Sequence, residues 1–300
     1  MPLAAAAPPI PVPILSGFDY VTVDAQRRRV YAAHAGSQAL LIVDADSGAV
    51  IGQVRVGPMR ELAVNPQNGH VFTANGDNRT VSEVDPETMK ELRTLELPVV
   101  LDALAYDAGR SRIFVDEDNG PHVTVIDANT FKVIATLELP AKKIEYLAVD
   151  PQTHDLYQNI DDRNAFAIVD GTTLKLKKIV STPELQHNHP LQYDSQLQQI
   201  VVGGGGVLSA YDRNGNKLGQ TALPRVDQCD LDASSHTLAC AGGQAITVYK
   251  LQAGAAPVKI AEVAVPPGVH TLAIDSKTRA IWAVWASKDG DFIQRFNLTP

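Results

Sequence analysis

The stretch that decides the fold reads LAVNPQNGHVFTAN over residues 62–75. An apolar run ends in Asp or Asn, a polar turn follows, and a second β-rich run comes next. The pattern recurs seven times, with its Asp or Asn at Asp24, Asn65, Asp107, Asp150, Asp194, Asp232 and Asp275, so that successive positions lie 38 to 44 residues apart. A strand-rich repeat of this length is typical of propeller blades. We therefore expect an all-β fold, a seven-bladed β-propeller.

Each repeat resolves into four short strands. In the second repeat they are predicted at 60–64, 70–75, 80–85 and 90–97, separated by turns rich in Asn, Asp, Gly and Pro. The seventh repeat ends after three strands, and the segment 10–16 resembles a spare fourth one. We expect residues 1–9 to be a flexible leader and 10–300 to be a single propeller domain. The N-terminal strand would complete the last blade, which leaves no open sheet edge.

Composition narrows the class of partner. Of the 300 residues 45% are hydrophobic, and the formal net charge is -8. An acidic chain is poorly suited to nucleic acid or to an anionic membrane surface, because both reward basic patches. No apolar run approaches the ~18 residues that span a bilayer. The Ala-rich start is either the remnant of an export signal or a plain leader, and we expect a periplasmic or secreted monomer.

The two cysteines fall in the sixth repeat. A turn centred on Ser234 and Ser235 places Cys229 opposite Cys240 on neighbouring antiparallel strands. Two interpretations follow: a pair of buried free thiols, or a cross-strand disulfide, which an exported protein would permit.

The repeats resemble those of the YVTN-type seven-bladed propellers. Residues 31–34 (YAAH) and 72–75 (FTAN) stand where that family has Tyr-Val-Thr-Asn, and 65–69 (NPQNG) resembles its Ser-Pro-Asp-Gly turn. The resemblance is clear in the first four repeats and weaker in the last three. It implies the propeller fold, and it leaves activity open because one fold hosts binding proteins, scaffolds and enzymes.

One position of the repeat carries only ionisable residues. Five residues before each repeat's Asp or Asn stand Asp19, Arg60, Asp102, Glu145, His189, Asp227 and His270. Each opens an innermost strand, so the propeller should gather all seven at one end of its axis. They could simply be solvated, or bond the backbone of adjacent blades. Alternatively, converging carboxylates and imidazoles shift one another's pKa or bind a cation, as active sites do.

The same position carries metal ligands in the gluconolactonase, senescence-marker and paraoxonase-like propellers, which this chain resembles in that respect. The resemblance implies Asp19, Glu145 and Asp227 as oxygen ligands. This chain lacks that group's Asn ligands and adds imidazoles, at His189, at His270 and at the nearby His187. If residues 187–189 are extended, both of their His side chains point the same way. Mixed imidazole and carboxylate ligands favour Zn, Mn, Fe, Ni or Cu over Ca.

Two functions follow from this ring. The first is a metal-dependent enzyme, a lactonase-like or esterase-type hydrolase or a lyase or isomerase, acting on a small anionic molecule. In it His189 and His270 would serve catalysis, Arg60 would orient the anion, and Tyr146 could act as an acid or base. The second is a non-catalytic exported propeller that binds a protein, a peptide or a cell-envelope ligand, which predicts an apolar or aromatic patch on the same face.

Overall fold

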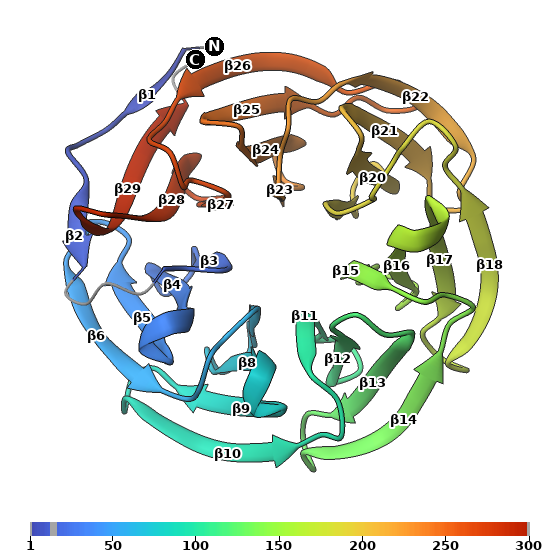
Figure 1. Ribbon diagram of the computed structural model, residues 1–300, viewed down its shortest axis with the longest axis horizontal. Coiled ribbons are helices and arrows are strands. Elements are labelled where there is room, and N and C mark those ends of the chain that lie inside the picture. The colour runs from blue at the N-terminus through green and yellow to red at the C-terminus, as the bar shows by residue number, and fades with distance from the viewer. Residues whose placement is uncertain (1, 13–16, 299–300) are drawn as a thin grey trace.

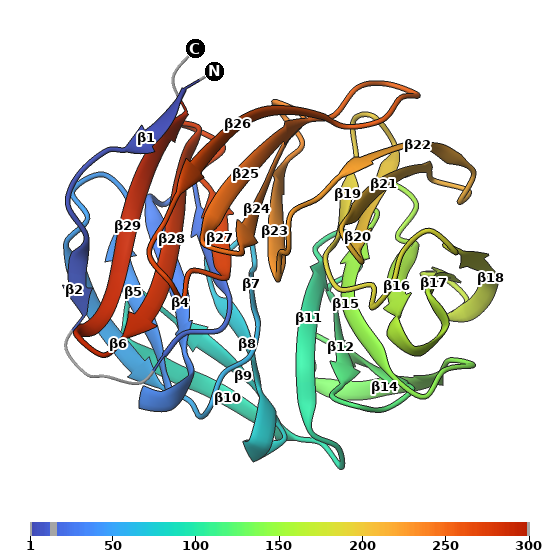
Figure 2. The same ribbon diagram turned by 45° about the horizontal axis from the view of Figure 1, so that its top comes forward.

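The computed structural model describes residues 2–12 and 17–298, whose strands form seven antiparallel blades around one axis (Figure 1). The turned view in Figure 2 shows the blades standing side by side with the two ends of the chain close together. The predicted seven-bladed propeller is confirmed. In the described ranges the helices are three 3-10 turns, namely η1 (Ala35–Ser37), η2 (Gly76–Asn78) and η3 (Asp161–Arg163). Nothing helical there is long and apolar enough to span a bilayer.

The first four blades each contain four strands, innermost first. They are β3 (Val21–Asp24), β4 (Arg29–His34), β5 (Ala39–Asp44) and β6 (Val50–Arg55); β7 (Leu62–Val64), β8 (Val71–Asn75), β9 (Thr80–Asp85) and β10 (Lys90–Glu96); β11 (Leu101–Asp107), β12 (Arg112–Glu117), β13 (His122–Asp127) and β14 (Lys132–Glu138); and β15 (Ile144–Val149), β16 (Leu156–Ile160), β17 (Ala165–Asp170) and β18 (Lys175–Ser181).

Blades 5 and 6 follow the same plan. They are β19 (Leu191–Asp194), β20 (Gln199–Gly204), β21 (Val207–Asp212) and β22 (Lys217–Ala222); and β23 (Gln228–Asp232), β24 (Thr237–Gly242), β25 (Ala245–Lys250) and β26 (Val258–Ala264).

The last blade joins the two ends of the chain. It consists of β27 (Thr271–Ile274), β28 (Ala280–Ser287) and β29 (Gly290–Leu298), and β2 (Ile10–Val12) pairs with the outer edge of β29. The predicted closure by an N-terminal strand is thus confirmed, while residues 13–16 of that segment lie outside the described residues. The sequence assigned residues 1–9 to a leader, whereas the structure pairs β1 (Leu3–Ala5) with the far end of β29. The reason is that β29 runs on to Leu298 and offers a further length of edge.

The Asp or Asn of each repeat is buried and closes the turn after the innermost strand. Its side-chain oxygen accepts the backbone N–H two residues on, for example from Gln26 to Asp24 at 3.0 Å and from Gln152 to Asp150 at 2.8 Å. Asx turns of this kind explain why only Asp and Asn stand at the position. All these turns lie at one end of the axis, which leaves the ionisable ring at the other.

The cysteines of blade 6 lie in register on β23 and β24 and form the disulfide Cys229–Cys240. Both residues are buried between blades 5 and 6, in one apolar cluster with Leu208 and Leu238. Of the two interpretations open at the sequence level, the structure has the cross-strand disulfide.

Candidate functional site

The seven ionisable residues, called the mouth ring from here on, stand where the innermost strands begin. The backbone N–H groups of Asp19, Arg60 and Asp227 donate to the carbonyl of the next-to-last residue in the adjoining second strand, at 2.9, 2.8 and 2.9 Å. Asp102 and Glu145 lie near the start of β11 and β15. These five side chains therefore start from hydrogen-bonded backbone, which fixes their origin and limits their motion.

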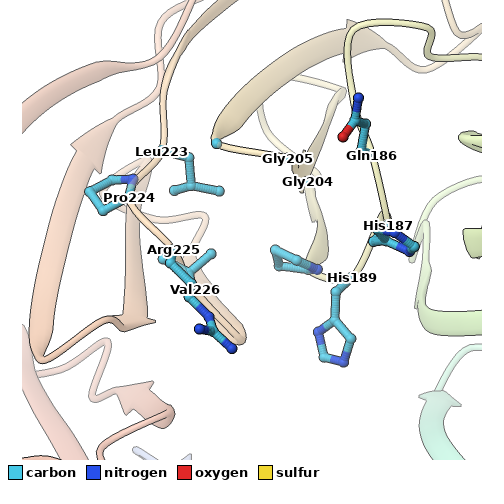
Figure 3. Close-up of a pocket in the computed structure, with 11 residues that line it drawn as sticks. Gln186, His187, His189, Gly204, Gly205, Leu223, Pro224, Arg225 and Val226 are labelled. Carbon is cyan, nitrogen blue, oxygen red and sulfur yellow. The ribbon is translucent and has the colours of Figure 1, made fainter.

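His189, Asp227 and His270 form one cluster, contributed by the openings of blades 5, 6 and 7. Asp227 Oδ2 lies 3.0 Å from His270 Nδ1, and Asp227 Oδ1 lies 3.8 Å from His189 Nδ1. Figure 3 shows the His189 ring pointing away from its loop. The Asp227 carboxylate thus lies close to both the His189 and the His270 imidazole.

The partners of each imidazole identify its protons. The His270 Nδ1 faces a carboxylate and its Nε2 lies 3.2 Å from the carbonyl of Phe18, so both nitrogens donate and the ring is an imidazolium. The hydrogen bond to Asp227 raises the pKa of His270 accordingly. Although burial opposes it, the bond from His270 lowers the pKa of Asp227.

His189 differs from His270 in that, among the described residues, only its Nδ1 makes a hydrogen bond. Its Nδ1 lies 2.7 Å from the backbone carbonyl of Asp227, an atom that can only accept, so Nδ1 must donate. Its other nitrogen, Nε2, lies 3.6 Å from Glu145 Oε2. Glu145 is buried and also pairs with Lys143. The side chain of His189 keeps 31% of its surface exposed, so a ligand can reach it.

Arg60 is engaged by Asp19, 3.5 Å away, and Gln228 donates to the same carboxylate at 3.3 Å. Burial raises the pKa of Asp19 in spite of Arg60. The structure thus gives the predicted anion-binding arginine a partner within the ring.

Asp102 has neither a side-chain hydrogen bond nor an ion pair within the described residues. Burial, together with repulsion from Glu145 and Asp19, raises its pKa to about 7. Behind it, Asp116 is buried and accepts hydrogen bonds from Gln158 at 2.9 Å and from the Ala103 N–H at 2.6 Å. Burial and the charge of Asp102 raise the pKa of Asp116 well above its usual range. Sequence reasoning placed Asp102 in the ring but gave it no role.

Tyr146 forms a floor beneath the ring. Its hydroxyl donates to the carbonyl of Cys229 at 3.0 Å and accepts from Gln192 at 2.8 Å, and its ring lies 5.7 Å from that of Tyr20. Burial raises the pKa of Tyr146 well above its usual range. A φ of 55° at a bulge in β15 turns the side chain this way, a conformation that costs a non-glycine residue energy. The structure places Tyr146 as a positioned support and not as an exposed acid or base.

His187 stands apart from the ring. Its side chain is 91% exposed, and its Nδ1 lies 3.2 Å from Asp161 on the top loop of blade 4. The expectation of a common direction with His189 required an extended stretch, but His187 has a φ of 51°. The left-handed residue turns the two side chains apart (Figure 3). In the described part of the chain, no three His, Cys, Asp or Glu side chains are already arranged around one metal position.

The loops around the ring differ in length. Blades 1 to 4 carry four-residue top loops, at 35–38, 76–79, 118–121 and 161–164, whereas blades 5 to 7 have two-residue turns at 205–206, 243–244 and 288–289. Hollows open above the short turns. Arg225, which sequence reasoning missed, lines two of them. The signal that could have found it is the pair of glycine runs at 203–206 and 242–243, which mark two-residue turns beside it.

Comparison with known proteins supports the fold of the chain but identifies no family. Neither a known family profile nor a curated protein matches the sequence. A chain of the solved structure titled "Crystal Structure of Mitotic Checkpoint Complex" is similar, with a TM-score of 0.84 and 14% identity over 99% of this chain and 92% of that chain. Likeness at this identity supports the propeller fold alone.

Proposed function

We propose that the mouth ring is the active site of a metal-dependent hydrolase for a small ester or lactone. The observation that carries the proposal is the orientation of His189. The carbonyl of Asp227 fixes its Nδ1 as a donor, so Nε2, 3.6 Å from Glu145 Oε2, is the nitrogen that a metal ion could use once it is unprotonated. An imidazole oriented by a backbone carbonyl is prepared to bind a metal ion or to accept a proton.

The donor set suits a transition metal ion better than calcium. His189 Nε2 and Glu145 would be the first two ligands, and the unpaired Asp102 a third. Imidazole mixed with carboxylates favours Zn, Mn, Fe, Ni or Cu. When bound, such an ion would polarise the acyl carbonyl and lower the pKa of a water. His270 fits poorly as a ligand because both of its nitrogens donate, and Asp227 is held between the two imidazoles. The resemblance to the gluconolactonase-like propellers supports a metal at this end of the axis.

The protein's own groups account for the proton transfers. The His270 imidazolium, whose side chain is 34% exposed, is the available general acid, and Asp227 stabilises its charge. In the proposed reaction the water oxygen bonds to the acyl carbon and the acyl C–O bond breaks. The leaving oxygen takes a proton from His270, which regains one from the water.

Metal titration of chelator-treated protein by calorimetry tests this proposal. We expect Zn²⁺ or Mn²⁺ to bind, and His189→Ala to weaken binding by roughly 100-fold, because one of few ligands is lost. The matched control is His187→Ala, two residues away and turned toward Asp161, which should bind as the wild type does. Absence of metal binding to the wild type, or equal loss in both variants, would overturn the proposal.

A non-catalytic binding propeller is the alternative. It predicts a broad apolar patch on the face that carries the ring. The exposed large hydrophobic residues of the described chain lie instead on the outer strands, namely Val50, Ile51, Leu92, Val133, Ile134, Leu176 and Val258. We therefore favour the enzyme. We also propose export to an oxidising compartment, which the Cys229–Cys240 disulfide supports.

A further inference from the structure

Three neighbouring hollows lie over blades 5 to 7 beside the mouth ring, and together they are called the trough because adjacent hollows share lining residues. Their volumes are about 380, 480 and 590 Å³. The first and second share Arg225 and Val226, and the second and third share Pro267 and Gly268. His189 lines the first hollow, and both Asp227 and His270 line the second, so the trough passes directly over the proposed catalytic cluster.

Two glycines at strand ends allow the loops that line the trough to pack closely against blades 5 and 6. A Cβ on Gly242 would lie 2.5 Å from Val226 Cα and 2.7 Å from the Arg225 carbonyl oxygen, and one on Gly204 would lie 2.7 Å from the Gln186 carbonyl oxygen. Contacts this short with backbone atoms exclude any side chain. The glycines therefore allow the backbone near Gln186 and Arg225 to pack directly against blades 5 and 6.

Arg225 is the cation of the first two hollows. It is exposed, lines two hollows and takes part in neither an ion pair nor a side-chain hydrogen bond within the described residues. Its charge lowers the pKa of Asp227, which places it close to the catalytic cluster. Figure 3 shows the guanidinium extending from its loop on the same side as His189. An unpaired guanidinium of this kind suits a carboxylate, which it can bind through two parallel hydrogen bonds.

The far end of the trough is apolar. Its walls include Pro266, Pro267, Ala286 and Phe292, and Phe292 stacks on the buried Trp285 with ring centroids 5.4 Å apart. Lys288 and Asp289, of opposite charge, edge the same hollow. An aliphatic or aromatic group placed here would be removed from water against rigid side chains.

From this pairing of ends we infer that the trough binds a carboxylate that carries an apolar arm. Arg225 holds the carboxylate, and the hollow bounded by Phe292 and Pro267 holds the arm. The inference rests on the proposed function in one respect: such an acid is the acyl product of ester hydrolysis over His189 and His270. Its substrate would then be an ester or lactone with a medium-length acyl chain.

Calorimetric titration with sodium decanoate in the presence of EDTA tests the inference, because binding of the acid requires neither metal nor turnover. We expect decanoate to bind, and Arg225→Gln to weaken it by roughly 10- to 100-fold, the effect of losing hydrogen bonds to a charged group. The matched control is Arg163→Gln, an exposed arginine on the top loop of blade 4, which should bind unchanged. Decanol should bind more weakly than decanoate and equally to wild type and Arg225→Gln.

A chain-length series examines the apolar end. From butyrate to decanoate, affinity should rise by up to roughly four-fold per methylene as each is buried. Phe292→Ala should flatten this rise and leave butyrate binding unchanged. Failure of decanoate to bind, or equal loss in Arg225→Gln and Arg163→Gln, would overturn the inference. Decanoate binding without metal binding would support the inference about the trough and contradict the metal-dependent hydrolase. Metal binding at His189 without decanoate binding would support the hydrolase and contradict the inference.

Discussion

Blades 1 to 4 and blades 5 to 7 share one scaffold but present different faces to a ligand. The first four carry four-residue top loops and contribute Asp19, Arg60, Asp102 and Glu145 to the ring. The last three carry two-residue turns and contribute His189, Asp227 and His270. Three of the four ring carboxylates thus lie among the longer loops, called the walled side, and both imidazoles lie beside the trough, called the open side.

The two sides of the ring are therefore suited to different roles, one to holding a cation and the other to receiving a small molecule. On the walled side, partly buried carboxylates repel one another and raise the pKa of Asp102, so that side gains from a cation. On the open side, hydrogen bonds define the proton positions and a molecule can approach. The two sides meet between Glu145 and His189, 3.6 Å apart, which is where we place the metal.

The largest expected effect is a loss of stability on the open side when a glycine beside a short turn is replaced. Gly242→Ala should destabilise the protein by about 4 kcal/mol, because Gly242 has a φ of 152° and its new Cβ would clash with backbone. Gly76→Ala on the walled side should cost no more than about 1 kcal/mol, since its nearest contact is the flexible side chain of Arg60. Urea denaturation measures both. Equal costs would mean that turn length does not distinguish the two sides.

The fold followed from the sequence because its causes are local. Every repeat needs an Asx turn after the innermost strand, and that need leaves an Asp or Asn at a fixed position that can be read directly. The closing strand could be predicted from the missing fourth strand of the last repeat. The pairing of β1 could not, because Leu3 and its neighbours carry no strand pattern and depend on the length of β29.

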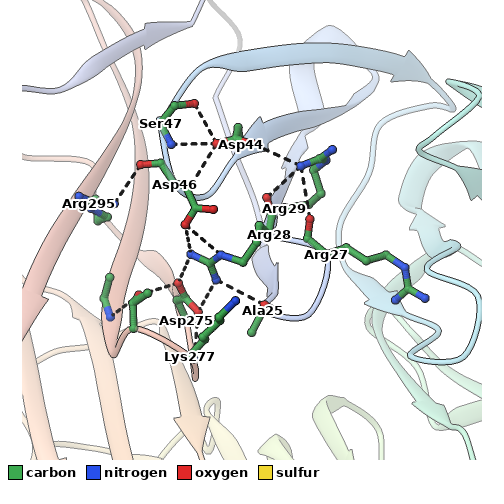
Figure 4. A network of polar contacts seen from close by, with 12 residues as sticks. Ala25, Arg27, Arg28, Arg29, Asp44, Asp46, Ser47, Asp275, Lys277 and Arg295 are labelled. Atoms are coloured by element: carbon green, nitrogen blue, oxygen red, sulfur yellow. Dashed lines mark hydrogen bonds and ion pairs between the residues drawn. The ribbon is translucent and has the colours of Figure 1, made fainter.

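The contact between blade 1 and blade 7, called the seam, contains a partly buried ion pair. Arg28 of blade 1 lies 2.7 Å from the buried Asp275 of blade 7 and also pairs with Asp46, as Figure 4 shows. Asp275→Asn keeps the Asx turn, as Asn65 does in blade 2, but loses the charge. It should cost about 3 kcal/mol at pH 7, since the Arg28 guanidinium loses its most buried partner.

The seam should also be sensitive to acid. Burial opposes ionisation of Asp275, but the bonds from Arg28 and Thr278 lower its pKa below the ordinary 3.8. A lowered folded-state pKa gives stability that is present above the unfolded value and lost as the pH falls through the folded one. The difference between wild type and Asp275→Asn should therefore shrink below about pH 4. A difference that stays constant from pH 7 to pH 3 would assign the loss to packing.

The open side also contains the disulfide. It closes a loop with a sequence separation of 11, and removing it should cost about 2–3 kcal/mol by freeing the unfolded chain. The measurement is urea denaturation with and without reductant, in wild type and in the double variant Cys229→Ala, Cys240→Ala. Reductant should affect only the wild type. Because Tyr146 bonds the Cys229 carbonyl, loss of metal binding on reduction would show that the floor of the ring depends on this bridge.

The site was less predictable than the fold because its causes lie between blades. The repeat placed all seven ring residues correctly at one end of the axis, but their partners are set by side-chain directions. Arg60 turned out to be engaged by Asp19, and a left-handed backbone at His187 separated it from His189. Arg225 stands outside the repeated position altogether, and the glycines packed against its backbone are the one local signal of it.

The smallest expected effect concerns Asp102 on the walled side. Unlike the other substitutions, its replacement should increase the stability of the protein. Asp102→Asn should stabilise the metal-free protein by about 1 kcal/mol at pH 8, because it removes a carboxylate that burial and Glu145 disfavour. The pKa of this acid is raised to about 7, so its cost is present above that pH and disappears as the pH falls toward the unfolded value of 3.8. The stabilisation should therefore fade by about pH 4. Thermal unfolding with EDTA at both pH values measures it, and saturating Zn²⁺ should reverse the sign because the wild-type carboxylate then has a cation to bind.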